Sequence, residues 1–343
     1  METDGRPVTR TRLLDVARAA GVSKSTASRI LNDSPDISVR PHTRERVLET
    51  ARRLDYRPHA AARSLRRAET GAIGLVIPNL AMPVYARIVR GAFHRALERD
   101  FVVLLAEDLV PRETNEVFTR LVRAGRIDGL IVASARPGHP LFRSVKRLAI
   151  PHVFANRAVR GSGRSIVMDD ASASKAALEH LVGLGHERIG HVGGPRTLDP
   201  ARRRAASFRK HAERLELAQA PVDEGEFTES GGSQAARRLL REHPGLSALY
   251  VSSLAQAVGA LHEAAQVGLR VPDDISLITY DDMPLADYLR PPLTAIRMPL
   301  AELGAAAVDA LVEQLLGGEP RDVVVEGEPE IVVRSSTAPP SRS

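Results

Sequence analysis

Apolar residues recur at helical spacing on both sides of Gly21. Before this glycine, one amphipathic helix is predicted by the positions i, i+3, i+4 and i+7, which are Leu13, Val16, Ala17 and Ala20. Gly21 can take the positive φ that ends such a helix, and Ser23 is suited to cap the next one. That second helix has inward positions Ala27, Ile30 and Leu31 and outward positions Ser25, Ser28, Arg29 and Asn32.

This pair of short helices around a tight glycine turn is typical of a helix-turn-helix, whose second helix lies in the DNA major groove. The pattern over Thr11–Asn32 also fits an ordinary helical hairpin with a solvated polar face. Charge favours DNA, because residues 1–70 hold 15 Lys and Arg against 9 Asp and Glu and so carry the whole net charge of +6. A localised positive excess is what the neutralisation of phosphates requires.

A third apolar stripe predicts a helix over His42–Leu54, which ends before Tyr56 and Pro58. An Ala-rich segment, His59–Arg67, then begins directly after Pro58. A helix this short is not stable alone in water, because nucleation costs more than so few hydrogen bonds return. We therefore expect this segment to become ordered only against DNA or against a partner copy.

From Ala72 onward, short apolar runs alternate with helical stripes. Near-continuous apolar strands separated by helices predict parallel sheets covered on both faces. This many runs exceed one ordinary sheet, so we expect two α/β subdomains. The runs are residues 72–78, 101–106, 129–134, 152–156, 165–169, 188–194, 248–253 and 275–282.

Composition excludes several classes of protein. The chain has no Cys, which rules out disulfides and thiolate metal sites. The first residues have no apolar core of an export signal, and no stretch approaches 18 uninterrupted apolar residues. We therefore expect a cytoplasmic, nucleoid-associated protein without a membrane span.

Fragments that suggest catalysis are better explained otherwise. Ser172–Lys175 fits S-x-x-K, but in an Ala-rich helical setting that lacks the accompanying motifs. His186 and His191 lie five residues apart, so they do not share a helical face as zinc ligands would. Asp281 and Asp282 point to opposite faces if they continue a strand. We expect no enzyme, no metal and no cofactor.

At this point five segments, taken in order, resemble the lactose-repressor (LacI/GalR) family of bacterial transcription regulators. They are DVARAAGVSKSTASRILN, TRERVLETARRLDYRPHAAARSLRR, TGAIGLVIPN, GLRVPDDISLITYDDMP and PPLTAIRMPLAELG. The likeness runs from Asp15 to about Ser335. It implies a transcription regulator, which we expect to be a repressor, that binds a palindromic operator as a homodimer or a dimer of dimers. It also implies control by a small-molecule effector, for which a sugar or sugar derivative is the candidate.

The implied fold is α/β: an N-terminal all-α helix-turn-helix headpiece and a periplasmic-binding-protein-like core of two doubly wound parallel-sheet subdomains. We expect a DNA-binding domain over 1–56, a hinge helix and linker over 57–69, the effector-binding and dimerisation core over 70–337, and a disordered tail over 338–343. Within the core, the first subdomain should comprise about 70–158 and 298–320, and the second about 159–297 and 321–337.

The resemblance also assigns residues to the DNA interface. Lys24 and Ser25 should set the base preference, while Arg29 is suited either to guanine or to a phosphate. Leu65 corresponds to an apolar wedge in the minor groove. The turn before the third helix is about two residues longer than is usual in the family, which leaves the contacts of Arg40 and His42 open. The full expected set is Lys24, Ser25, Thr26, Ser28, Arg29, Asn32, His59, Ala62 and Leu65.

For the effector, the resemblance places Arg204 and Asp281 in a cleft between the subdomains, consistent with ligands binding beyond strand carboxyl ends. Weaker matches, equally compatible with ordinary packing, are Tyr85, Asn156 and Phe227, with Ser253 beside them. Sugar-sensing members commonly have Asn-Asp where this chain has Ser252 and Ser253, which makes a simple hexose less certain. A solute-binding protein of a transporter would share this core, but the basic headpiece and the missing signal argue against it. A sugar-modifying enzyme would need an acid–base pair that the sequence does not offer.

Overall fold

The computed structural model describes residues 11, 13–31, 37, 39–56, 70–108, 111–136 and 138–341. The chain divides into two compact units, one ending at Gly71 and the other beginning at Ala72. The expected hinge helix lies outside the described residues, as do the expected DNA contacts Asn32, His59, Ala62 and Leu65. No helix in the described ranges is long and apolar enough to cross a bilayer.

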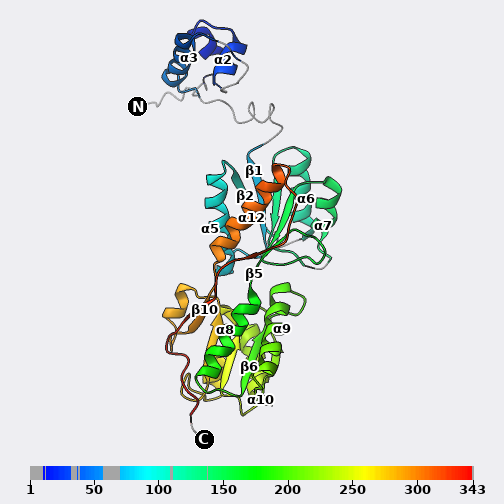
Figure 1. The fold of residues 1–343 in the computed structure, drawn as a ribbon, viewed down its shortest axis with the longest axis vertical. Coiled ribbons are helices and arrows are strands. Elements are labelled where there is room, and N and C mark those ends of the chain that lie inside the picture. The colour runs from blue at the N-terminus through cyan, green and yellow to red at the C-terminus, as the bar shows by residue number, and fades with distance from the viewer. Residues whose placement is uncertain are drawn as a thin grey trace, which may run out of the picture. The chain divides into compact units, whose positions relative to one another are not determined.

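The first unit contains α1 (Leu13–Ala19), α2 (Lys24–Leu31) and α3 (Pro41–Arg53) (Figure 1). Gly21 takes a φ of +63°, and Ser23 Oγ accepts the backbone N–H of Thr26 at 3.0 Å, so the predicted turn and cap are both confirmed. Arg46 Nε donates to the carbonyl of Ala20 at 3.0 Å and ties α3 to the end of α1. The small core is built from the predicted inward positions with one residue of α3: Ala17, Ala20, Ala27, Ile30 and Val47.

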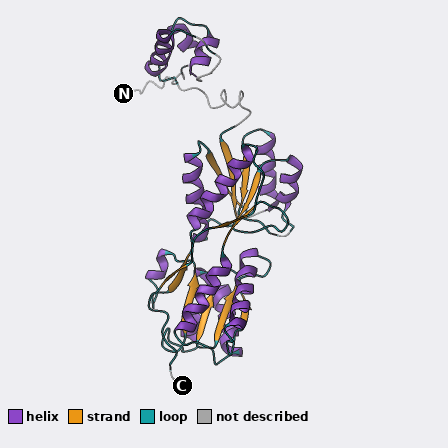
Figure 2. Cartoon of the chain, in the orientation of Figure 1, coloured by secondary structure: helices purple, strands orange, loops and turns teal. Residues whose placement is uncertain are grey.

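The second unit starts with a parallel sheet of six described strands in the order β11-β5-β4-β3-β1-β2. The strands are β1 (Ala72–Ile77), β2 (Val102–Glu107), β3 (Gly129–Val132), β4 (His152–Ala155), β5 (Ser165–Met168) and β11 (Val323–Val325). Its helices are α5 (Pro83–Glu98), α6 (Pro111–Arg123), α7 (Pro140–Leu148) and α12 (Leu300–Leu315), and they cover both faces (Figure 2).

Helices α5 and α12 touch along their backbones. A Cβ placed on Gly91 would lie 1.9 Å from the carbonyl oxygen of Ala301, and one on Gly304 would lie 2.0 Å from that of Ile88. Only glycine permits this approach. The opposite face of the sheet is covered by α6 and α7, whose Phe118, Leu141 and Val145 belong to a second core cluster.

The second sheet has the order β12-β10-β9-β8-β6-β7, and all its described pairs are parallel except β10 with β12. The strands are β6 (Ile189–Gly193), β7 (Val222–Glu224), β8 (Ala248–Val251), β9 (Ser276–Tyr280), β10 (Thr294–Arg297) and β12 (Glu330–Val332). The helices around it are α8 (Asp170–Gly183), α9 (Asp199–Arg214), α10 (Glu229–Glu242), α11 (Leu254–Gln266) and the short 3₁₀ turn η1 (Pro284–Asp287). The two doubly wound sheets expected from the sequence are therefore confirmed, with an antiparallel edge strand as an addition.

The expected subdomain boundaries need correction. β5 pairs with β4 and β11 pairs with β5, so both strands extend the first sheet, although 159–297 and 321–337 were expected in the second subdomain. The chain passes between the sheets after β5, after β10 and after β11. Sheet membership depends on long-range pairing, which a short apolar run does not encode by itself.

The expected disorder of residues 338–343 is wrong for residues 338–341. The backbone N–H of Ala338 donates to Ser276 Oγ at 3.0 Å, and its carbonyl lies 2.9 Å from His186 Nε2. Ser341 Oγ donates to the carbonyl of Asp273. A composition rich in Pro and Ser indicates disorder only when the backbone has no partners, and here the second subdomain supplies them.

Candidate functional sites

The outward face of α2 is the candidate DNA interface. Ala27 and Ile30 are buried, whereas Lys24, Ser25 and Arg29 are exposed and Thr26 and Ser28 are half-buried. Ser23 Oγ lies 2.8 Å from both Ser25 Oγ and Thr26 Oγ1, which fixes these hydroxyls around the N-terminus of the helix. The described contacts expected from the sequence thus lie together on one short helix that carries no acidic residue.

The first turn of α3 adds polar groups to the same unit. Arg40 precedes the helix in an extended conformation, Pro41 occupies the first turn, and no side chain caps it. Arg40 and His42 are exposed, and this turn contains no acidic residue. The backbone N–H groups of Thr43 and Arg44 both donate to the carbonyl of Arg40, so the exposed side chains of Arg40 and His42 are the groups suited to a phosphate here.

Arg204 is the centre of a buried polar cluster at the carboxyl ends of the second sheet. From α9, its Nε donates to Asp170 Oδ1 at 2.8 Å and its Nη1 donates to the carbonyl of Ser252 at 2.6 Å. Its guanidinium lies 3.4 Å from the centre of the Tyr280 ring. Burial opposes the charged form, but Tyr280 and Asp170 outweigh it and raise the pKa of Arg204.

Asp281 follows β9 directly and lies beside this cluster. Its φ of +73° is rare for a residue other than glycine, and such backbone strain is typical of functional sites. Only 7% of the residue is exposed, yet its Oδ1 has no hydrogen-bond partner. Burial raises the pKa of Asp281 to about 6, against the opposing attraction of Arg204. The side chain therefore keeps one acceptor available for a ligand.

The first subdomain places Asn156 and Tyr85 at the equivalent end of its own sheet. Asn156 follows β4, which has the same position in its sheet order as β9, and it also has a positive φ of +66°. Its Nδ2 donates to the Tyr85 hydroxyl at 3.3 Å. Arg87, on the same helix as Tyr85, is close enough to Asp281 for its positive charge to oppose the rise in the pKa of Asp281 that burial causes.

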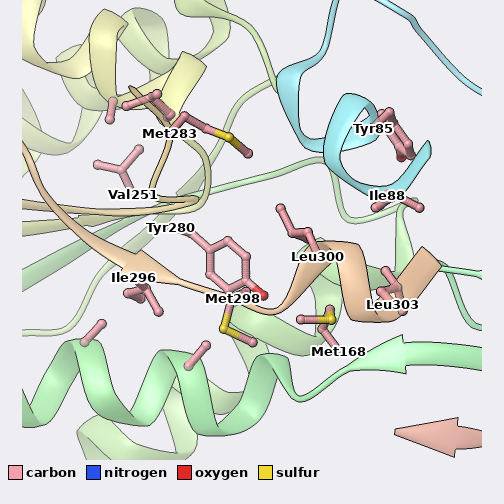
Figure 3. Packing of buried hydrophobic residues seen from close by; sticks show 14 of the residues in the cluster. Tyr85, Ile88, Met168, Val251, Tyr280, Met283, Ile296, Met298, Leu300 and Leu303 are labelled. Atoms are coloured by element: carbon pink, nitrogen blue, oxygen red, sulfur yellow. The ribbon is translucent and has the colours of Figure 1, made fainter. Parts of the chain in front are cut away.

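Contacts between the two subdomains bring these ends together. Arg203 Nη2 donates to the carbonyl of Asn156 at 3.2 Å, and the N–H of Ala158 donates to Asp199 Oδ2 at 2.9 Å. Tyr280 packs with Met298 and Leu300 beside Met168, in a core cluster shared by both sheets (Figure 3). The four expected residues Arg204, Asp281, Tyr85 and Asn156 thus lie in one region.

Ser253 and Phe227 have local structural contacts. Ser253 Oγ caps α11 by accepting the N–H of Gln256 at 3.3 Å. Phe227 is half-buried over Gly194, at the carboxyl end of β6, where an added Cβ would lie 2.3 Å from its Cζ. Both positions border the same sheet edge, and their contact with a ligand stays a prediction.

Sequence reasoning missed Asp170, Arg203 and Tyr280. Asp170 follows β5 at a strand end, which was a usable signal, whereas Tyr280 reads as one more apolar strand residue. The two histidines weighed as zinc ligands have structural contacts. His186 Nδ1 lies 2.9 Å from Ser247 Oγ. His191 is stacked between Phe208 and Tyr250, at 4.9 and 4.6 Å, and burial lowers its pKa to about 3. In the described part of the chain, no group of three or more metal-ligating side chains comes together.

Comparison with known proteins agrees with this architecture. The model for bacterial regulatory proteins of the lacI family matches residues 12–59, and that for a periplasmic binding protein-like domain matches residues 178–337. The HTH-type transcriptional regulator MalR of Streptomyces coelicolor is 31% identical over 340 residues, covering 96% of this chain and 97% of the relative. The ribose operon repressor of Escherichia coli K12 is 32% identical over 305 residues, covering 88% and 92%.

Solved structures extend the likeness to three dimensions. The lac repressor dimer bound to operator and the anti-inducer ONPF has a TM-score of 0.83 at 28% identity, covering 96% of this chain and all of that one. The CelR–cellobiose complex has a TM-score of 0.73 at 28% identity, covering 95% and 100%. With relatives above 30% identity over nearly the whole length, the chain belongs to the lacI family of bacterial regulatory proteins and is a DNA-binding transcriptional regulator.

Proposed function

We propose that the protein represses transcription by binding an inverted-repeat operator as a homodimer, and that a sugar or sugar derivative at the carboxyl ends of the two core sheets controls this binding. The DNA-binding half is supported by the acid-free outward face of α2 within the only strongly basic part of the sequence. The effector half is carried by one observation: Asp281 keeps a buried, unpartnered carboxylate oxygen beside Arg204.

The polar groups of this region suit a ligand rich in hydroxyls. Asp281 Oδ1 can accept from a hydroxyl, and Arg87 and the Asn156 side chain lie on the opposing subdomain. A buried acceptor without a partner is costly, and a ligand that supplies the donor removes this cost. The CelR relative was solved with cellobiose, and we extend a carbohydrate-like effector from there to this chain.

Dimerisation is supported by apolar surface at the β2 edge of the first sheet. Val102 and Leu104 on β2 are 63% and 38% exposed, and Phe93 and Leu97 on the neighbouring α5 are 41% and 76% exposed. An open strand edge with large apolar side chains is a liability for a monomer and a natural interface for a second copy. We propose that this edge is covered in the dimer.

Two experiments test the proposal. Selection of DNA from a random pool by the full-length protein should yield an inverted repeat with half-sites about one helical turn apart. A fragment starting at Thr70 should not bind the selected DNA, and an enriched pool without two-fold symmetry would contradict dimeric binding.

A thermal-shift screen of sugars, polyols and nucleosides should find a stabilising effector, because a ligand at 100 times its Kd adds about 2.7 kcal/mol to the free energy of unfolding.

A further inference from the structure

A cavity of about 640 Å³ lies in the first subdomain, away from the sites described above. It is bounded by the C-terminal part of α7, the start of β4, the loop 159–164 and the segment 314–320 at the end of α12. His152, the first residue of β4, lines it, whereas Asn156 of the effector region follows the last residue of that strand. We propose that this cavity is a second ligand site, which takes a small anion with an apolar body.

The floor of the cavity is apolar and well packed. Phe142 and Phe154 meet edge to face with ring centres 5.1 Å apart, and His152 meets Phe154 in the same manner at 5.5 Å. Val145 and Ile150 complete this wall and are buried in the second core cluster. A concave apolar surface of this volume is in the size range of small-molecule sites.

The rim of the cavity is positively charged. Its lining includes Lys146, Arg160 and Arg164 and no carboxylate. Arg164 Nη1 donates to the neutral Oε1 of Gln314 at 2.7 Å, so its charge is not compensated there. In the described part of the chain, no carboxylate lies within ion-pair distance of Lys146 or Arg160. Three uncompensated cations above an apolar floor favour an anionic ligand over a neutral one.

His152 adds an acceptor inside the cavity. Its Nδ1 lies 2.8 Å from the carbonyl of Ile150 and donates to it, which leaves Nε2 as the acceptor of a neutral ring. Burial lowers the pKa of His152, in keeping with the neutral ring. A ligand with a carboxylate or phosphate at the rim and a donor group near the floor would use all of these groups.

Fluorine NMR on the full-length protein tests the site with defined probes. We use 4-fluorophenyl phosphate and 4-fluorobenzoate as anionic probes, 4-fluorobenzyl alcohol as the neutral analogue, and inorganic phosphate as a competitor. At least one anionic probe should bind saturably in the millimolar range or tighter, as expected for a molecule of this size. The neutral analogue should bind at least tenfold more weakly, and the tighter of the two anions identifies carboxylate or phosphate as the preferred group.

Two double variants locate the binding. The double variant Lys146→Gln with Arg160→Gln removes two rim charges. It should lower the affinity of the protein for the anionic probe at least tenfold. Arg143→Gln with Arg147→Gln removes the same charge from exposed positions of α7 that do not line the cavity, and should change the affinity less than twofold. Three results would each overturn the proposal: an equal loss of affinity for the anionic probe in both double variants, binding of the neutral analogue as tight as that of the anionic probes, or no saturable binding of either anionic probe. Because all four side chains are exposed or lie at the rim, an unchanged melting temperature should accompany both doubles.

Discussion

The guanidinium of Arg204 lies over the ring of Tyr280, 3.4 Å from its centre, while the same group is bonded to Asp170. Tyr280 is the last residue of β9 and Asp281 is the next, so one stacked pair positions the backbone that carries the candidate effector acid. Arg204 therefore has a structural role, through its contacts with Tyr280 and Asp170, as well as supplying a positive charge beside the candidate effector acid.

Replacing Arg204 by Ala should destabilise the protein strongly. The change removes the cation bonded to Asp170 Oδ1, whereas Arg203 remains 2.6 Å from Asp170 Oδ2. Leaving a buried charge without any partner typically costs about 3–5 kcal/mol, so with Arg203 still in place we expect a loss of about 2–3 kcal/mol. Denaturant unfolding measures the loss. Arg202→Ala on the same helix removes an exposed ion pair with Asp199 and should cost less than about 1 kcal/mol. If both variants lose the same stability, the packing role of Arg204 is refuted.

Asp281→Asn should separate ligand response from DNA binding. The charged acceptor is lost while the shape is kept, and a hydrogen bond to a charged group contributes about 1.5–3 kcal/mol, so the effector from the thermal screen should bind at least tenfold more weakly. Fluorescence anisotropy with the selected operator should show affinity within about twofold of wild type. The exposed Asp287→Asn variant serves as the control. An unchanged effector response in Asp281→Asn would place the effector elsewhere.

The pH dependence of stability should also report Asp281. Because its pKa in the folded protein is about 6 and its ordinary value is 3.8, the folded state binds the proton more tightly than the unfolded state. The contribution of this group to stability therefore falls as pH rises from about 4 to about 6, by an amount on the order of 3 kcal/mol. Paired carboxylates such as Asp274, whose pKa is lowered to about 2, act in the opposite direction at lower pH. The measurement is thus the difference between wild type and Asp281→Asn, and a pH-independent difference would contradict the assignment.

Arg29 should discriminate between two kinds of DNA contact. If it contacts a guanine, Arg29→Ala costs about 1–3 kcal/mol on the operator and relaxes the preference at one base position. If it contacts a phosphate, operator and random DNA lose affinity equally. Gel-shift titrations on both DNAs measure this, with Arg53→Ala at the end of α3 as the exposed control.

The glycines between α5 and α12 should resist substitution. Gly304→Ala would place a Cβ 2.0 Å from the carbonyl of Ile88, so the helices must separate, and we expect a loss above about 2 kcal/mol. Gly183→Ala in α8 meets nothing within 4 Å and should stabilise by up to about 1 kcal/mol through helix propensity. Thermal melts of the two variants should shift in opposite directions, and shifts of the same sign would refute the close helix contact.

The sequence predicts the secondary structure that follows from local periodicity. It does not predict the contacts between residues that are distant in the sequence. The stripes around Gly21 predict α1 and α2 because helix faces repeat within a few residues. Arg204 and Asp281 were located by resemblance, but the partner Asp170 is brought to Arg204 by the fold across 34 residues. The assignment of β5 and the order of residues 338–341 failed for the same reason, since both depend on partners distant in the sequence.

The passage of the chain between sheets has a consequence for synthesis on the ribosome. The first subdomain begins at β1, yet its edge strand β11 and its covering helix α12 emerge only after nearly all of the second subdomain has been made. Until then, the part of the first sheet that α12 covers is exposed, and so is the surface of α5 around Gly91, against which the backbone of α12 packs in the finished protein. The second subdomain, contiguous from α8 to β10 apart from its antiparallel edge, can complete most of its own sheet first. We therefore expect the second subdomain to complete its fold before the first, although the first subdomain begins earlier in the chain and is translated earlier.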